Sequence, residues 1–212
     1  VACGFSGPRR PWAGSLRDYL LGVKVINGRG HALRFGGQVM KNVAGYDVSR
    51  LQAGALGTLG VITEVSLKVL PLPETAITLA YDCSAPEALD TMLRRSVEPG
   101  PLAGACWFEG RLFLRLAGSA AAVQRTRSDW GGDVVEGDAP WAELNAFALP
   151  FFDCEGPLLR LSLPPTSRVG LDAEPLLLDW GGAQRWLYAG EDAASWAESA
   201  AAEGGHAWVF RG

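Results

Sequence analysis

The sequence predicts an α+β protein in two sections, the second of which carries the same structural unit twice. Residues 61–70 alternate between two sets of side chains with period two, which is typical of a β-strand. Asn27-Gly28 separates two apolar runs, as in a β-hairpin. After residue 73 one order of strand and helix patterns recurs, which indicates a duplicated domain.

Composition argues against several classes of function. The 212 residues suffice for one large or two small domains, and 48% hydrophobic with 20% charged residues is an ordinary globular balance. A net charge of −4 without a long basic stretch argues against a nucleic-acid partner. No apolar run approaches the roughly 20 residues of a membrane-spanning helix. We therefore expect a cytoplasmic protein with neither a nucleic-acid partner nor a transmembrane segment.

The cysteines and histidines predict no metal site. The four cysteines form no C-x-x-C pair, the spacing that zinc and iron–sulfur sites usually show. We expect them to be reduced thiols rather than two disulfides. His31 and His206 are the only histidines, too few for a His-rich site. The cysteines are Cys3, Cys83, Cys106 and Cys154.

The first section is expected to comprise a loop, a hairpin, a short helix and a strand. The loop is rich in glycine, proline and arginine, and Asp47 stands where it can begin the helix. Pro71 and Pro73 end the strand, so we predict a first domain of residues 1–73. The elements are expected at residues 1–17, 20–26 with 32–35, 46–53 and 61–70.

The second section, residues 74–212, is expected to hold two ferredoxin-like units, at about 74–138 and 139–212. Gly118 and Gly131 correspond to Gly190 and Gly204 at nearly the same offset. Each copy has the order βαββαβ, which places helices on one face of an antiparallel sheet. A solenoid is the alternative, but two copies are too few for one. The expected elements include strands 76–81 and 158–163, a helix at 86–97, a shorter one at 166–171, and turns at Gly110 and Gly181-Gly182.

Two glycine-rich stretches can bring the backbone close to a ligand. In residues 2–18, glycines that accept positive φ let consecutive N–H groups cradle a pyrophosphate. From composition alone, a loop packed against another part of the protein is favoured over that reading. Residues 54–63 carry three glycines before a strand, whereas a Rossmann motif needs a helix there and a P-loop needs Gly-Lys-Ser/Thr. A strand edge after glycines suits a flat heterocycle held by backbone bonds.

A polar group of residues lies between these stretches. Lys41 and Asn42 stand beside Gly45, Tyr46 and Asp47. A turn held by Asn42 and Asp47, with Lys41 on the surface, accounts for them most simply.

Three motifs in order resemble a known family. They are DYLLGVKVINGRG, GGQVMKNVAGYDVSRL and GALGTLGVITEVSLKVLP, which together span residues 18–71. The ordered set resembles the vanillyl-alcohol-oxidase or p-cresol-methylhydroxylase type of FAD-linked oxidase, and residues 6–51 are similar to its glycolate oxidase branch. The resemblance is strong over residues 1–73 and faint over 74–212.

The resemblance implies that residues 1–73 are the second half of an FAD-binding domain and that residues 74–212 form the cap over the flavin. The small preceding subdomain of the family is missing here, so we expect the chain to be a piece of a longer protein that binds FAD weakly or not at all by itself. Family contacts to FAD correspond to Ser6, Gly7, Gly14, Ser15, Gly60, Val61 and Ile62, the last three through backbone atoms on the adenine side.

The resemblance also implies a function. It is an FAD-binding subunit of a glycolate oxidase or dehydrogenase complex, which oxidises glycolate to glyoxylate and passes electrons through flavin. The implied partners are a second flavoprotein subunit and an iron–sulfur subunit, which could hold the protein at the inner face of the cytoplasmic membrane. The alternatives are a non-catalytic assembly or electron-relay subunit, or an FAD-linked oxidase of another alcohol. The isolated chain is expected to be inactive.

The chain departs from the family in its cap. Relatives that oxidise 2-hydroxy acids often carry paired histidines and a carboxylate there, whereas this cap has only His206. We can therefore name no catalytic base. Four acidic residues at turns or helix starts are expected to act as caps, and seven tryptophans are expected to pack in the core or an interface rather than to stack on flavin. They are Glu109, Asp179, Glu191 and Asp192, and Trp107, Trp130, Trp141, Trp180, Trp186, Trp196 and Trp208.

Overall fold

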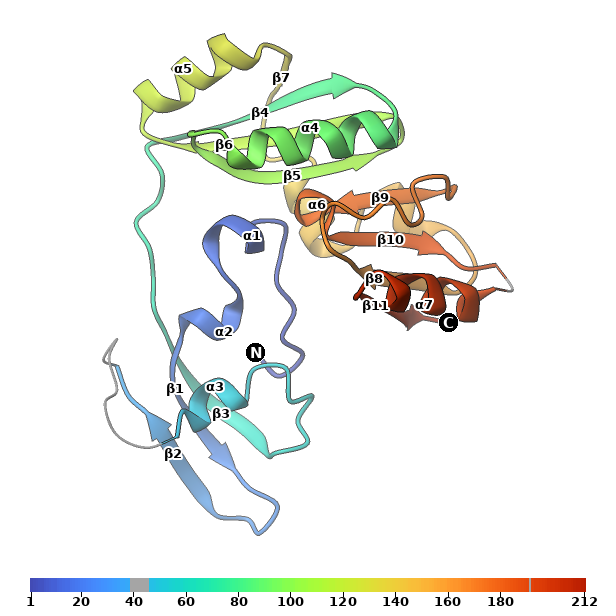
Figure 1. The fold of residues 1–212 in the computed structure, drawn as a ribbon. Coiled ribbons are helices and arrows are strands. Elements are labelled where there is room, and N and C mark those ends of the chain that lie inside the picture. The colour runs from blue at the N-terminus through green and yellow to red at the C-terminus, as the bar shows by residue number, and fades with distance from the viewer. Residues whose placement is uncertain (39–45, 191) are drawn as a thin grey trace. The chain divides into compact units, whose positions relative to one another are not determined.

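The computed structural model describes residues 1–38, 46–190 and 192–212. The chain divides into two compact units, Val1–Leu72 and Pro73–Gly212, which we call unit 1 and unit 2. Both combine helices with antiparallel strands, so the α+β prediction is confirmed (Figure 1).

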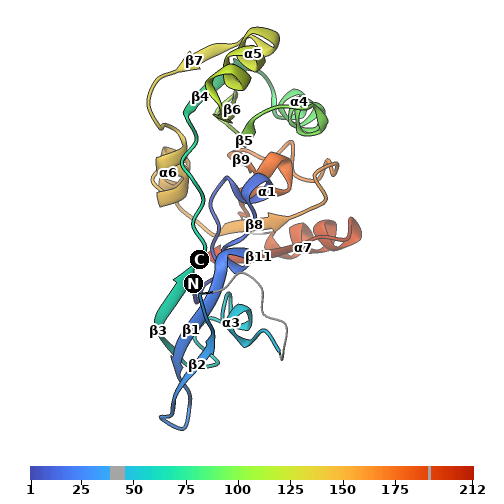
Figure 2. The same cartoon turned by 90° about the vertical axis from the view of Figure 1, so that its left-hand side faces the viewer.

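Unit 1 is built on a three-stranded antiparallel sheet with the order β2-β1-β3. Its core consists of Leu20, Val23 and Val25 of the central strand, with Phe35 and Ile62 from the two neighbours packed against them. The short helix α3 lies against this sheet (Figures 1 and 2). The elements are α1 (Arg10–Ala13), α2 (Leu16–Tyr19), β1 (Leu20–Ile26), β2 (Ala32–Gly36), α3 (Val48–Leu51) and β3 (Val61–Leu67).

The local signals in unit 1 have the expected effect. Asp47 caps α3, because its carboxylate accepts a hydrogen bond from the Arg50 amide at 3.0 Å. Asn27 holds the predicted hairpin, since its side-chain oxygen accepts from the amides of Arg29 and His31. The connection is a five-residue loop rather than a two-residue Asn-Gly turn, and the positive φ falls on Gly30.

Strand β3 differs from an ordinary half-buried strand. Its alternation predicts period two correctly, but the set with more apolar residues is largely exposed. Val61 is 66% exposed and Leu67 43%, whereas Ile62 of the other set packs on the core.

Unit 2 is one continuous eight-stranded sheet made of two similar halves. The first half has the order β7-β4-β6-β5 and the second the order β11-β8-β10-β9, so both share the ferredoxin-like arrangement. Antiparallel pairing of β5 with β9, through Trp107 with Leu178 and Phe108 with Leu177, joins the halves. The elements are β4 (Thr75–Asp82), α4 (Ala85–Val97), β5 (Leu102–Phe108), β6 (Arg111–Gly118), α5 (Ala120–Trp130), β7 (Asp133–Val135), α6 (Trp141–Ala146), η1 (Pro150–Asp153), β8 (Leu158–Ser162), β9 (Leu176–Asp179), η2 (Trp180–Gly182), β10 (Gln184–Tyr188), α7 (Ala193–Ala202) and β11 (His206–Arg211).

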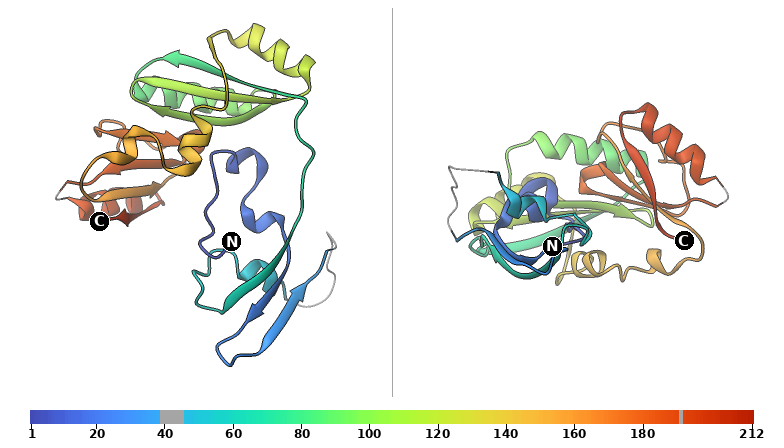
Figure 3. Two further views of the ribbon diagram at one scale, coloured as in Figure 1. Left: turned by 180° about the vertical axis from the view of Figure 1, so that it is seen from behind. Right: turned by 90° about the horizontal axis from the view of Figure 1, so that it is seen from below.

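The segment between the halves covers the sheet face opposite α4 and α7, as the front and back views show (Figures 1 and 3). Trp141 and Leu144 of α6, with Phe151 and Phe152 of η1, are buried against sheet residues such as Trp186. The indole N–H of Trp141 donates to the Thr78 hydroxyl at 2.8 Å, so this polar group is satisfied inside the core. The sequence patterns did not predict these two helices.

The helix expected at residues 166–171 is wrong, because the segment forms turns. Gly170 has φ +76, a left-handed conformation that an α-helix does not contain. Backbone carbonyls of this segment, which a helix would have satisfied, are instead bound by the side chain of Arg185 of β10. Its guanidinium is fully buried and donates to the carbonyls of Ser167, Val169 and Gly182, and burial lowers its pKa to about 10.

We predict that Gly60→Ala destabilises unit 1 by about 1–3 kcal/mol. Gly60 has φ +143, and a Cβ there would lie 2.5 Å from the Ile26 carbonyl oxygen of the neighbouring strand. Gly57→Ala is the matched control, since φ is +78 there but a Cβ would meet no atom within 4 Å. Hydrogen–deuterium exchange of β1 and β3 measures the difference. Equal protection of these strands in the two variants would contradict the prediction that a Cβ at residue 60 destabilises unit 1.

Candidate cofactor-binding surface

Residues 1–4 lie directly beside residues 54–56 in unit 1. The amide of Gly54 donates to the Val1 carbonyl at 3.2 Å, and the amide of Leu56 donates to the Ala2 carbonyl at 2.9 Å. A Cβ at Gly4 would lie only 2.9 Å from the Gly54 Cα, so the close approach requires glycine. The structure thus brings together the two glycine-rich stretches that are separated in sequence.

Ser6 links this loop to the start of α2. Its hydroxyl accepts a hydrogen bond from the Leu16 amide at 3.4 Å. Ser15 forms a capping box with Asp18, whose Oδ2 accepts from the Ser15 amide at 2.8 Å and from its hydroxyl at 2.7 Å. The bonds from the Ser15 hydroxyl and amide hold the pKa of Asp18 below its usual value. Gly14 is exposed, with φ +92 at the end of α1.

The remaining expected contact residues lie in the same unit. The Gly7 carbonyl accepts from the Arg10 amide at 3.1 Å. Gly60 packs against β1 and leads into β3, where Val61 is exposed and Ile62 is partly buried. Lys41, Asn42 and Gly45 of the expected polar group lie outside the described residues.

The chemistry of this surface fits a dinucleotide. Exposed glycines at 4, 14, 54 and 57 leave the backbone accessible, and a Cβ at Gly57 would point into open space. Arg9, Arg10 and Arg17 are exposed on the first stretch and give it positive charge. Backbone amides and cations together are the usual donors to a pyrophosphate. The three arginines add a signal that the glycine spacing alone did not provide.

Unit 2 contains a buried polar chain that the sequence did not reveal. The Asp179 carboxylate is 3% exposed and accepts from the Trp180 amide at 2.7 Å and from the Gln184 side chain at 3.2 Å. The Gln184 oxygen in turn accepts from Arg160 Nε at 2.7 Å. Burial raises the pKa of Asp179 to about 7, against the opposing effects of these hydrogen bonds and of Arg160.

The acidic residues of unit 2 act mostly as the sequence predicts. Asp179 caps η2, and Asp192 caps α7 by accepting from the Ser195 amide at 3.3 Å. Glu109 lies in the turn between β5 and β6, and Glu191 is outside the described residues. Within the described ranges, no group of three His, Cys, Asp or Glu side chains could hold a metal ion.

The tryptophans of unit 2 serve mainly in packing, as predicted. Trp141 and Trp186 are each 3% exposed and Trp180 is 7% exposed. Trp208 on β11 is an exception, because its side chain is 48% exposed. The Arg160 guanidinium lies over the rings of Trp180, Trp186 and Trp208, at 5.1, 5.7 and 5.5 Å from their centroids.

Solved structures have the same fold. A structure of alkyldihydroxyacetonephosphate synthase aligns over 100% of this chain and 53% of its own, with a TM-score of 0.62 and 14% identity. At that identity the likeness shows the fold alone. The likeness agrees with the predicted fold class, an α+β protein with antiparallel sheets.

Sequence comparison defines the family more closely. Glycolate oxidase subunit GlcE of Escherichia coli (strain K12) is 46% identical over 211 residues, which are 99% of this chain and 60% of the relative. Glycolate oxidase subunit GlcD of Bacillus subtilis (strain 168) is 48% identical over 66 residues, 31% of this chain and 14% of the relative. No protein-family model matches the chain. The predicted resemblance to glycolate oxidase is confirmed over 99% of this chain, which spans 60% of the length of the E. coli relative.

Among the residues that the structure describes, no helix is both long enough and apolar enough to cross a membrane.

We predict that Asp179→Asn stabilises unit 2 at pH 8 by an amount on the order of a few kcal/mol. The folded-state pKa of about 7 lies above the unfolded value of 3.8, so this group stabilises the fold fully only below pH 3.8. That contribution is lost as the pH rises through 7. Asparagine resembles the protonated carboxyl group and removes this loss.

Urea unfolding between pH 4 and pH 8 measures the effect of this substitution. Asp192→Asn is the control, because it makes the same substitution at a helix cap that is exposed rather than buried. An Asp179→Asn protein that keeps the wild-type pH dependence would show that the carboxylate is ionised in the folded state at neutral pH.

Proposed function

We propose that this chain belongs to an FAD-binding subunit of a glycolate oxidase complex and supplies one side of the flavin site. The observation that carries this proposal is the contiguous glycine-rich surface of unit 1, where residues 1–7, 14–16 and 54–62 meet. The similarity to glycolate oxidase subunit GlcE supports it. In this proposal residues 1–73 are the later half of the FAD-binding domain, and residues 74–212 are the cap.

The contact residues are proposed to act in two ways. Ser6, Gly7 and Gly14 present backbone and hydroxyl groups to the pyrophosphate side, and Gly60, Val61 and Ile62 present backbone to the adenine side. Ser15 is proposed mainly to shape the loop, because Asp18 already binds both its amide and its hydroxyl. When bound, FAD supplies the two-electron oxidation of the C–H bond next to a hydroxyl group.

The substrate and partners are proposed from the family resemblance. We propose glycolate as the substrate and glyoxylate as the product, with another 2-hydroxy acid or alcohol as the alternative. A second flavoprotein subunit and an iron–sulfur subunit would receive the electrons, and these partners would hold the protein at the inner face of the cytoplasmic membrane. We propose no acid or base residue for this chain.

A second role is supported by a specific feature of unit 2. His206, the single histidine of residues 73–212, is exposed at the start of β11, so no histidine pair is present to bind a metal and substrate. In this alternative the subunit relays electrons or organises the complex while its partner oxidises glycolate. Full glycolate oxidation by the partner subunit alone would support this role. Loss of all oxidation when only this subunit's flavin is removed would support the catalytic role.

The flavin site is tested by charge placement on β3. We predict that Val61→Asp in the full-length subunit weakens FAD binding by about tenfold or more, which corresponds to at least roughly 1.4 kcal/mol. A carboxylate there repels the phosphates and crowds the adenine side. Val61 is already 66% exposed in unit 1, so its polar substitution should not disturb the fold.

Val69→Asp is the matched control, since Val69 is 84% exposed in the same unit but lies beyond the proposed contacts. The flavin-to-protein ratio, read from the visible absorbance, measures the outcome. Equal flavin content in both variants and the wild type would contradict the proposal that the start of β3 contacts FAD.

A further inference from the structure

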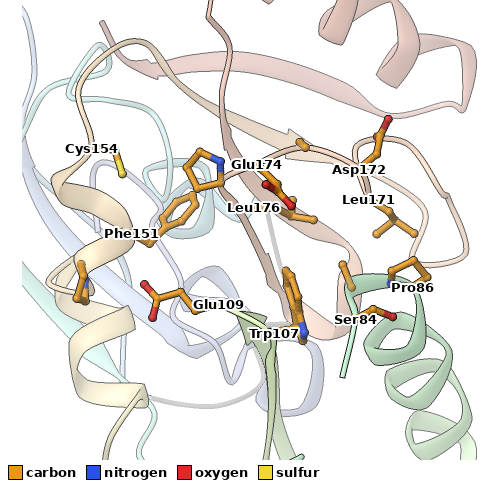
Figure 4. A pocket seen from close by; sticks show the side chains of 15 residues that line it. Ser84, Pro86, Trp107, Glu109, Phe151, Cys154, Leu171, Asp172, Glu174 and Leu176 are labelled. Carbon is orange, nitrogen blue, oxygen red and sulfur yellow. The ribbon is translucent and has the colours of Figure 1, made fainter. Parts of the chain in front are cut away.

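Unit 2 contains a cavity of about 720 Å³, and all of its lining residues belong to this unit (Figure 4). It lies among the start of α4, the turn between β5 and β6, η1 and the segment before β9. Its walls are largely apolar. Phe151 and Leu176 are 4% and 5% exposed, and the Trp107 indole is fixed by a 2.8 Å hydrogen bond from its N–H to the Cys83 carbonyl.

The volume indicates the size of the occupant. Pockets for small molecules typically measure roughly 300–1,000 Å³, and this cavity falls within that range. A single basic side chain from another protein would leave most of the space unfilled. The cavity therefore favours a whole small molecule with substantial hydrocarbon surface.

The charge at the opening is uniformly negative. The lining includes Glu109, Asp172 and Glu174, all exposed, and no lysine, arginine or histidine. None of these three carboxylates forms an ion pair with another residue in the described ranges. Arg111, adjacent to the turn, is instead paired with Asp82 and Asp133. A ligand that fits this opening is cationic.

The carboxylates are spread along the opening rather than gathered at one point. Figure 4 shows Glu109 at one end, Asp172 at the other and Glu174 between them. They belong to no metal-binding group among the described side chains, so they do not converge on one ion. Separated anions above an apolar floor match several cations separated by hydrocarbon.

We propose that this cavity binds a linear aliphatic polyamine. Its protonated amines meet the rim carboxylates, while its methylene groups lie against Leu176 and Trp107. The indole adds a cation–π contribution where an amine passes its face.

The turn provides a substitution that separates binding from folding. Glu109 has φ +50 and Gly110 has φ +76, and two-residue hairpin turns with positive φ at both positions favour asparagine at the first. Glu109→Asn therefore removes one rim charge while keeping or improving the stability of the turn. Glu174→Gln removes a second charge, and Glu198→Gln on the exposed side of α7 is the control outside the cavity.

Isothermal titration calorimetry of the purified protein with spermidine at low salt tests the proposal. We expect spermidine to bind and octanediol, an uncharged molecule of similar length, not to bind. Glu109→Asn and Glu174→Gln should each weaken spermidine binding by about two- to fivefold, as for partly exposed charge pairs. Glu198→Gln should leave the affinity unchanged, and added salt should weaken it.

Three results would each overturn the proposal. They are no spermidine binding to the wild type, octanediol binding as tight as that of spermidine, and wild-type affinity in both rim variants. Circular dichroism establishes that each variant is folded, and if Glu109→Asn is not, Glu174→Gln decides. The measured quantity is spermidine binding and not flavin content, so a failure here is distinguishable from a failure of the function proposed for unit 1.

Discussion

The backbone contact between Gly4 and Gly54 is the constraint on which the proposed flavin site depends. A side chain at Gly4 would overlap the Gly54 backbone, and the amides of Gly54 and Leu56 bind the carbonyls of Val1 and Ala2. Together these contacts place the N-terminal loop beside the stretch that leads into β3. Glycine therefore has two roles here: it permits close packing of two chain segments and it leaves backbone exposed to a ligand.

Local chemistry made much of unit 1 predictable. Asp47 near the start of the expected helix predicted a cap, and Asn27 predicted the hairpin loop. The exposed face of β3 was not predictable, because alternation gives the period of a strand but not the identity of its neighbours. Only Ile62 of this strand packs on the core around Val23 and Val25. The exposed positions of Val61 and Leu67 follow from tertiary contacts.

The duplication in unit 2 was predictable because its glycines and tryptophans recur, but the joining of the halves was not. Pairing of β5 with β9 is a long-range contact between segments that look like ordinary buried strands. The missing second-copy helix had a signal, since Gly170 lies inside the short stretch expected to form it. The replacement of its hydrogen bonds by Arg185 had none, because the guanidinium and the loop carbonyls are brought together only by the fold.

The candidate site shows the same division. The expected contact residues came from the family resemblance, whereas glycine spacing alone favoured an ordinary packed loop. The structure adds that the Ser15 amide already donates a hydrogen bond to Asp18. It also shows that glycine is needed at position 60 because a Cβ there would clash with the Ile26 carbonyl. The hydrogen-bonded chain from Asp179 through Gln184 to Arg160 connects the three strands β9, β10 and β8, and no sequence pattern predicted it.

Hydrogen–deuterium exchange of the full-length subunit, with and without FAD, tests the central claim most directly. The account predicts that FAD slows exchange in residues 3–7, 14–16 and 54–62 together. Unchanged exchange in all three segments, at FAD concentrations that load the protein with flavin, would contradict it.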